Sequence, residues 1–343
     1  MERIDVRRDG HRLCEEGFWV VVATFEGRVD AWRCASVERS PAAAEPPTLS
    51  ADWAGPDAHQ WDSSLSRDEY MDSVERIRAT IRDGGVYQAN LCRVMSAPLS
   101  GQGGVPDPVA LSATLTHGNP ARYASRLWFP GTDDAPGAWV VSASPELYLG
   151  IDGSRVRSSP IKGTAAPDAR MLDKDVAENI MITDLMRNDL SHVAAPGTVA
   201  VPELLAEHPH PGLTHLQSTV EAQLAPELAW TPQMWPALLD ATFPPGSVSG
   251  APKAAALEVI AREESQPRGP YCGGIGWVDA EAQTAEIAVG IRTFWWTPDR
   301  GGRLHFGTGA GITWGSDPAG EWAETELKAQ RLIALASTDR MTA

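Results

Sequence analysis

The spacing of short apolar runs is the feature that most constrains the fold of this chain. Several runs have the length of a β-strand and end at glycine or aspartate turns, while only a few segments have the longer helical spacing. Strand and helix patterns do not follow one another in the regular alternation that builds a parallel sheet. We therefore expect an α+β protein with a large antiparallel component.

The strand candidates begin with apolar runs at 18–25 and 29–34, which predict a hairpin around Glu26 and Gly27. Further candidates are 86–94, 138–142, 147–151, a strand from Ser154 that runs into PIKGT, 216–222, 275–278, 285–296 and 304–307. In 86–94, Gln88 and Asn90 share a face with Cys92, so polar side chains point to a surface that a strand usually hides. This face hints at binding.

Helices are predicted at 66–83, 173–189 and after Asp317 and Pro318. The first begins with a capping box at Ser66 and ends at two glycines. The segment 40–56 is rich in proline and alanine and is expected to be a loop or linker. A polar segment rich in His and Pro follows the second helix.

Composition excludes several classes of function. The 343 residues carry a formal net charge of −16, so long-range electrostatics oppose binding to nucleic acid or to an anionic membrane. The 4 cysteines lack CxxC spacing, which argues against a disulfide framework and a structural zinc site. Since no apolar stretch is long enough to span a membrane and the start is polar, we expect a soluble, cytoplasmic protein.

Two basic residues stand in unusual settings. Lys162 follows a strand and precedes a glycine, where an amine can be a surface charge, a nucleophile or a base. Arg292 lies within the apolar run 285–296, so it needs a partner. That partner is either a structural carboxylate or a ligand carboxylate held in a bidentate clamp.

Acidic residues recur at helical spacing in two places. Asp175 and Glu178 share one helix face, and Glu321 and Glu324 share another, together with Lys328. Carboxylates of this kind suit Mg²⁺, which usually binds one or two of them. An exposed charged face is the alternative.

Two glycine-rich segments, 246–253 and 307–313, expose backbone N–H groups, and the first leads into a helix start that favours anions. Each can equally be a plain turn, and neither matches a nucleotide-binding motif. The chain has no GxSxG, and no cysteine lies in the GxCxG setting of glutamine-hydrolysing domains. If glutamine nitrogen is used, another chain must release it.

Taken together, a series of phrases between residues 66 and 335 resembles the chorismate-utilising enzymes, in the order that this family has. The phrases are GGVYQANLCR (84–93), SASPELYLGI (142–151), PIKGT (160–164), DKDVAENIMITDLMRNDLSHV (173–193), PGTVAVPEL (196–204), THLQSTV (214–220), PPGSVSGAPK (244–253), RGPYCGGIGW (268–277), IRT (291–293), GAGI (309–312) and EWAETELKA (321–329). The resemblance implies an anthranilate synthase component I-like, chorismate-binding fold, in which two antiparallel sheets form a β-sandwich flanked by helices.

The phrase PIKGT resembles aminodeoxychorismate synthase component I, whereas anthranilate synthases usually carry PIAGT. The resemblance implies that Lys162 is a covalent nucleophile that attacks C2 of chorismate as the C4 hydroxyl leaves. Ammonia then adds at C4 and gives 4-amino-4-deoxychorismate, for 4-aminobenzoate and folate or for a specialised metabolite. Alternatives are an anthranilate or 2-amino-2-deoxyisochorismate synthase, and a catalytically silent chorismate-binding scaffold.

The resemblance also assigns roles to the other candidate residues. Glu178 and Glu324 match Mg²⁺ ligands, supported by Asp175 and Glu321, and His215 matches a histidine near the substrate. Gln88 occupies the position where water-using relatives place a lysine, which argues against water as the nucleophile. The remaining substrate-binding positions are Ser249, Tyr271, Arg292, Gly309, Ala310, Gly311 and Lys328.

The family order also predicts the domain organisation. It divides the chain into a shortened N-terminal section (1–65), a catalytic domain (66–335) and a tail (336–343). The shortened front makes a tryptophan pocket doubtful, and a separate glutaminase subunit is the expected source of ammonia.

Overall fold

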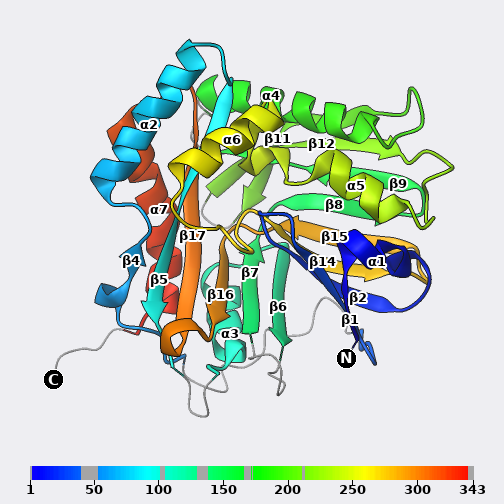
Figure 1. Ribbon diagram of the computed structural model, residues 1–343, viewed down its shortest axis with the longest axis horizontal. Coiled ribbons are helices and arrows are strands. Elements are labelled where there is room, and N and C mark those ends of the chain that lie inside the picture. The colour runs from blue at the N-terminus through cyan, green and yellow to red at the C-terminus, as the bar shows by residue number, and fades with distance from the viewer. Residues whose placement is uncertain are drawn as a thin grey trace. The chain divides into compact units, whose positions relative to one another are not determined.

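The computed structural model describes residues 2–39, 53–100, 105–129, 138–165, 171, 173–210 and 213–338. The chain divides into two compact units, each assembled from three segments (Figure 1). Unit 1 contains Met1–Val37, Glu146–Val248 and Gly273–Val289, and unit 2 contains Glu38–Pro145, Ser249–Cys272 and Gly290–Ala343. Among the described helices, none is both long and apolar enough to cross a membrane.

Unit 1 is built on a ten-stranded antiparallel sheet with the order β1-β3-β2-β14-β15-β8-β9-β12-β10, and β11 pairs with β12. The strands are β1 (Glu2–Asp5), β2 (Phe18–Ala23), β3 (Val29–Arg33), β8 (Leu147–Asp152), β9 (Arg155–Ser159), β10 (Ile161–Ala165), β11 (Ala200–His210), β12 (Leu213–Gln223), β14 (Gly274–Asp279) and β15 (Thr284–Val289). The predicted hairpin is β2 and β3, and β2 pairs with β14. The front of the chain therefore extends the same sheet as its middle.

The helices of unit 1 are α1 (Val6–Asp9), η1 (Gly10–Cys14), α4 (Asp173–Ser191), α5 (Met234–Thr242) and η3 (Gly246–Val248). Helix α4 contacts β10 and β12. Its buried stripe contains Ile182, Met186 and Leu190 at helical spacing, and the polar residues Asn179 and Thr183 lie on the same stripe. Two polar side chains therefore face the interior from the helix that carries the acidic pair.

Unit 2 is built on a seven-stranded antiparallel sheet with the order β13-β5-β17-β16-β7-β6, and β4 pairs with β5. The strands are β4 (Asp62–Ser63), β5 (Gln88–Pro98), β6 (Tyr123–Phe129), β7 (Ala138–Ser144), β13 (Gly250–Ala251), β16 (Thr293–Thr297) and β17 (Arg303–Ile312). The helical elements are η2 (Ala58–Gln60), α2 (Arg67–Arg82), α3 (Pro108–Gly118), α6 (Lys253–Glu263), η4 (Asp299–Gly301) and α7 (Pro318–Ala336).

Helices α2 and α7 begin where the sequence predicts. The Ser66 side chain accepts from the Glu69 N–H while the Glu69 carboxylate accepts from the Ser66 N–H, which completes the capping box. Asp317 caps α7 by accepting from the Gly320 N–H at 2.8 Å, and Pro318 occupies the first turn. The two helices are in contact and lie side by side in Figure 1.

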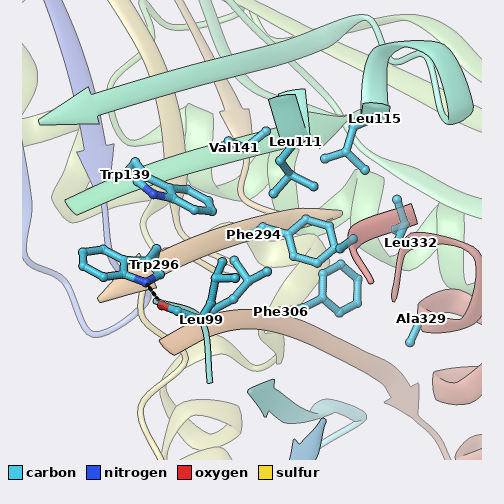
Figure 2. Packing of buried hydrophobic residues seen from close by; sticks show 12 residues of the cluster. Leu99, Leu111, Leu115, Trp139, Val141, Phe294, Trp296, Phe306, Ala329 and Leu332 are labelled. Carbon is cyan, nitrogen blue, oxygen red and sulfur yellow. Dashed lines mark hydrogen bonds between the residues drawn. The ribbon is translucent and has the colours of Figure 1, made fainter. Parts of the chain in front are cut away.

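One core of unit 2 is rich in aromatic residues and lies between β7, β16, β17, α3 and α7 (Figure 2). The rings of Phe294 and Phe306 have centroids 4.7 Å apart, and both side chains are buried. The buried indole N–H of Trp296 donates to the Leu99 carbonyl at 2.9 Å, so this polar group is satisfied inside the core. The core therefore fixes β16 and β17 against the helices.

Several predicted elements are wrong in detail. The run 285–296 is two strands, β15 and β16, and they belong to different sheets. Arg292 therefore lies in the break between strands, with a φ of 52°, and not inside a strand. Lys162 lies within β10 rather than after a strand, and β17 continues through the glycine cluster to Ile312.

Other elements were missed. The polar segment after α4 contains β11, and α3, β6 and α5 had no strong pattern in the sequence. Most of the loop predicted at 40–56, namely residues 40–52, lies outside the described residues, as do residues 339–343 of the predicted tail.

Candidate active site

The predicted site residues fall into two groups, one in each unit. In unit 1, Lys162 comes from β10, His215 from β12, and Asp175 and Glu178 from α4. Because α4 packs on both strands, these residues gather around one helix and two strands. His215 is buried, and the Glu178 side chain is only 13% exposed and lies 3.7 Å from the Lys174 ammonium.

Lys162 is presented by an irregularity in its strand. The pairing of β10 with β12 shifts register between Ile161 and Thr164, so Lys162 and Gly163 lie inside this bulge. Gly163 has a φ of 95°, and a Cβ there would lie 2.9 Å from the Asp175 Cβ. A bulge with an obligatory glycine re-aims the neighbouring side chain, and this accounts for the glycine after the lysine.

In unit 2, β17 carries three glycines on one face. Because side chains alternate along a strand, Gly307, Gly309 and Gly311 share a face, and Ala310 and Ile312 point the other way into a buried cluster. A Cβ on each glycine would meet a different group, namely the Tyr271 ring at 2.0 Å, the Cys92 Sγ at 2.5 Å and the Gln88 Nε2 at 2.1 Å. The glycines therefore bring Gln88, Cys92 and Tyr271 onto this one face.

Gln88 is the most unusual residue of this face. It is 1% exposed, and neither its amide nitrogen nor its amide oxygen has a hydrogen-bond partner among the described residues. Buried polar groups are almost always hydrogen-bonded, because leaving one unpaired costs about 1–3 kcal/mol. The Gln88 amide therefore keeps its hydrogen-bonding capacity for a further polar group.

Tyr271 packs its ring on Gly307, and its hydroxyl lies 3.8 Å from the Cys92 Sγ. Burial raises the pKa of the Tyr271 phenol well above its usual value, and the neighbouring cysteines act in the same direction. Burial likewise raises the pKa of the Cys92 thiol. The phenol is therefore neutral at physiological pH and can donate a hydrogen bond to an anionic ligand.

A buried ion pair supports the start of β5. The Arg268 and Glu264 side chains are 1% and 7% exposed, and the guanidinium donates to both carboxylate oxygens. Arg268 also donates to the Asn90 carbonyl at 3.0 Å, while Glu264 accepts from the Cys92 N–H at 2.8 Å. The pair thereby fixes the backbone on either side of Leu91, next to the glycine face.

Two further predicted residues are placed by backbone hydrogen bonds within unit 2. Ser249 is fully buried, and its carbonyl accepts from the Asn90 N–H at 2.9 Å, which brings it to β5. The Arg292 carbonyl accepts from the Ala143 N–H at 3.0 Å, which ties the break before β16 to β7.

The acidic residues of α7 have local partners. The Lys328 ammonium is 2.6 Å from a Glu324 oxygen and donates to the Gly309 carbonyl at 3.1 Å, so α7 is tied to the glycine face. Glu321 is buried one turn earlier and accepts from the Ser316 hydroxyl at 2.5 Å.

The donor chemistry of these helices fits a hard divalent cation. Oxygen ligands from Glu178 and Glu324 are the kind that Mg²⁺ takes, one or two at a time. In the part of the chain that the structure describes, no three His, Cys, Asp or Glu side chains form a metal-binding cluster. Each of the two helices, α4 in unit 1 and α7 in unit 2, therefore carries carboxylates of a kind that Mg²⁺ takes.

The sequence did not reveal Asn179, Thr183 and Ser218 as buried polar residues of unit 1. Asn179 is 1% exposed, and its side-chain amide donates to the carbonyls of Lys162 and Leu216. Its position on the apolar stripe of α4 was the available signal, because a polar residue there must find partners.

Comparison with known proteins identifies the family. A model of chorismate binding enzymes matches residues 21–334. Aminodeoxychorismate synthase component 1 of Klebsiella aerogenes is 36% identical over 286 residues, which cover 80% of this chain and 59% of that protein. Anthranilate synthase component 1 of Streptomyces coelicolor is also 36% identical, over 80% of this chain and 52% of that protein. The chain thus spans little more than half the length of these relatives.

Solved structures show the same fold. Anthranilate synthase component I from Streptococcus pneumoniae superimposes with a TM-score of 0.75 at 22% identity, covering 96% of this chain and 86% of that one. The menaquinone-specific isochorismate synthase from Escherichia coli has a TM-score of 0.73 at 18% identity, covering 98% and 84%. The predicted fold class is therefore confirmed. Given the family model and these relatives, the chain belongs to the chorismate-binding enzymes.

Proposed function

We propose that this protein is an aminodeoxychorismate synthase component I, which converts chorismate and ammonia to 4-amino-4-deoxychorismate. The observation that carries this proposal is Lys162, held in a bulge of β10 and followed by a glycine with a φ of 95°. A structural lysine on a surface strand has no need of such an arrangement, whereas a nucleophile must be aimed at its target atom.

In the proposed reaction, the Lys162 amine forms a bond to C2 of chorismate, the ring double bond shifts and the C4 hydroxyl leaves. Ammonia then adds at C4, the double bond shifts back, and the bond to Lys162 breaks to regenerate the amine. Gln88 argues against water as the nucleophile, because a neutral amide cannot act as the base that would activate a water molecule.

The residues of unit 2 would bind and orient the anionic substrate. The Tyr271 phenol, the Arg292 guanidinium, the Lys328 ammonium and the backbone of Gly309–Gly311 would hold its carboxylates. The side-chain amide of Gln88 would gain the hydrogen-bond partner that it lacks among the described residues. Ser249 would line the ring-carboxylate side. From unit 1, His215 would lie near the substrate.

Glu178 and Glu324 would hold Mg²⁺, with Asp175 and Glu321 orienting them, and the bound ion would supply Lewis acidity toward the departing hydroxyl. Ammonia would come from a separate glutaminase subunit, in keeping with relatives that are named as component 1 of their synthases. Purified alone, the chain is therefore expected to use ammonium and not glutamine.

A direct test compares Lys162→Ala with Lys162→Arg in an assay with chorismate, Mg²⁺ and ammonium. Both changes are expected to reduce formation of 4-amino-4-deoxychorismate at least about 1,000-fold, because arginine keeps the positive charge but is not a nucleophile. The product is followed by adding an aminodeoxychorismate lyase and detecting 4-aminobenzoate. Substantial activity of Lys162→Arg would show that only the charge matters.

Anthranilate formation is the second candidate, because the Streptomyces coelicolor anthranilate synthase component is as similar in sequence as the first relative. The same assay without the lyase distinguishes the two. If the wild type forms anthranilate, the protein is an anthranilate synthase component and our first proposal is wrong.

A further inference from the structure

A buried polar network lies beneath Lys162 in unit 1, and the proposed reaction assigns no role to it. Its three side chains, Asn179, Thr183 and Ser218, are between 0% and 3% exposed. Asn179 and Thr183 come from α4, and Ser218 comes from β12. The network therefore joins the helix that carries Glu178 to the strand that carries His215.

The donors and acceptors of this network have only one consistent arrangement. The Leu205 N–H donates to the Ser218 oxygen at 3.0 Å. The Ser218 hydroxyl donates its own proton to the Asn179 Oδ1 at 2.5 Å. The Asn179 Nδ2 donates to the Leu216 carbonyl at 3.1 Å and to the Lys162 carbonyl at 3.4 Å. Because both carbonyls can only accept, the amide cannot be turned over.

The hydrogen bond to Lys162 occurs where the sheet does not hold the backbone in register. The ladder between β10 and β12 passes from Ile161 paired with Gln217 to Thr164 paired with His215, which leaves Lys162 in the bulge. A bulge leaves backbone groups without their ladder partners. The Asn179 amide provides a partner from the helix, and with the same nitrogen it holds Leu216, the neighbour of His215.

We propose that Asn179 is the positioning residue of this site, which sets where the Lys162 amine stands relative to α4 and β12. The proposal rests on the proposed function for its catalytic consequence, but the placement of Lys162 can be measured separately. Asn179 acts through the backbone and does not touch the substrate. A displacement of about 1 Å at a reacting group can lower the rate by about 100-fold.

Three variants separate positioning from stability. Asn179→Asp keeps the shape and the oxygen that accepts from Ser218, but a carboxyl has no N–H and at most one O–H, so at least one of the two donations to the backbone carbonyls is lost. Asn179→Ala removes the whole side chain. Thr183→Val is the matched control, because it removes a buried hydroxyl of the same network, which lies 2.7 Å from the Asn179 backbone carbonyl and 3.3 Å from its Oδ1. It leaves the donations from the Asn179 Nδ2 to Lys162 and Leu216 in place.

Two measurements are made on variants whose melting curves show that they are folded. With ammonium as the nitrogen source, both Asn179 variants are expected to lose about 10-fold to 100-fold in kcat, while KM for chorismate changes less than about threefold. Thr183→Val is expected to keep kcat within about twofold of the wild type, even where its melting temperature falls. Asn179 variants with kcat within about twofold of Thr183→Val would overturn the proposal.

The second measurement does not depend on the reaction. The protein is acylated with a limiting amount of an amine-reactive reagent, and peptide mass spectrometry gives the extent of labelling of each lysine. The labelling of Lys162 is compared with that of the other lysines of the chain, Lys174, Lys253 and Lys328. Asn179→Asp is expected to change the relative labelling of Lys162, and Thr183→Val is not. If the wild type makes no aminated product, the proposed function is wrong, and the labelling alone then tests whether Asn179 positions Lys162. Unchanged labelling of Lys162 in Asn179→Asp overturns the positioning role in either case.

Discussion

Glycine in β17 serves to create space rather than to make a turn. Gly307, Gly309 and Gly311 have ordinary strand conformations, and each is required because another side chain occupies the volume of its missing Cβ. A glycine inside a strand is otherwise unfavourable, so the three together indicate a surface that other groups must approach closely. The strand loses local stability there and gains close contacts with Tyr271, Cys92 and Gln88.

We therefore expect Gly311→Ala to damage the site more than the fold. The new Cβ would lie 2.1 Å from the Gln88 Nε2, so the Gln88 side chain must move. Overpacking of this kind costs about 1–3 kcal/mol, and kcat/KM for chorismate should fall by more than about 10-fold. Gly315→Ala is the control, since a Cβ there has no neighbour within 4 Å. Wild-type kcat/KM in Gly311→Ala would refute the assigned role of Gln88.

A site residue could be predicted from the sequence where a local pattern marks it, and not where its role depends on distant contacts. Lys162 and its glycine form a local phrase, so the sequence was sufficient to select them. The role of Asn179 depends on contacts with β10 and β12, and no local pattern encodes these. Arg292 was selected as an unusual cation, but its place between two strands was missed because apolar residues continue on both sides of it.

At the scale of elements, β16 and β17 meet around a histidine. His305 stacks on its cross-strand neighbour Trp295, with centroids 5.2 Å apart, and lies 3.0 Å from the Thr297 hydroxyl. Burial, aided by the Arg303 charge, lowers the pKa of His305 to about 4. The histidine therefore stays neutral between the strands at physiological pH.

This lowered pKa predicts that the protein loses stability in mild acid. Below the unfolded pKa of about 6.5, the unfolded chain binds a proton that the folded chain does not, so the free energy of unfolding falls until the pH reaches the folded value. Between about pH 7.5 and about pH 5 the His305 contribution to this loss is about 2 kcal/mol. Urea unfolding of the wild type and of His305→Gln at both pH values gives the loss of unfolding free energy in each protein, and the difference between the two losses is the contribution of His305. An equal loss in both proteins would contradict the assignment.

The helices and strands that were predicted correctly have local sequence patterns, whereas those that were missed depend on pairing with distant strands. Helix α2 was predicted to within a residue because its capping box and its apolar stripe are both local. Strand β11 was missed because its register with β12 shifts twice, at Ala200/Glu203 and at Glu203/Ala206, so its side chains keep no simple alternation. The end of β15 was missed because its partner strands, and not its composition, determine where it stops.

At the scale of the whole molecule, the net charge of −16 becomes a constraint on stability. Self-repulsion of like charges destabilises any compact state, and salt screens it over a Debye length of about 10 Å at about 0.1 M. The anionic substrate that we propose would therefore have to be attracted by local cations and N–H groups rather than by the general field. The basic residues named for this purpose are Lys162, Arg292 and Lys328.

Added salt is accordingly expected to stabilise the protein. The melting temperature should rise between about 0.01 M and about 0.15 M NaCl, because screening relieves the repulsion faster than it weakens exposed ion pairs, each of which contributes only about 0–1 kcal/mol. Differential scanning calorimetry at constant pH measures the change. A melting temperature that falls over this range would show that attractive pairs dominate the charge balance.

The interleaved composition of the two units has a consequence for how the protein is made. Unit 1 needs the segment Gly273–Val289, and unit 2 needs residues from Gly290 onward. A ribosome that has released the first 250 residues has therefore delivered neither unit whole. Both sheets must wait, with unpaired strand edges, for the last quarter of the chain, so nascent copies of this protein should depend on chaperones that shield such edges during synthesis.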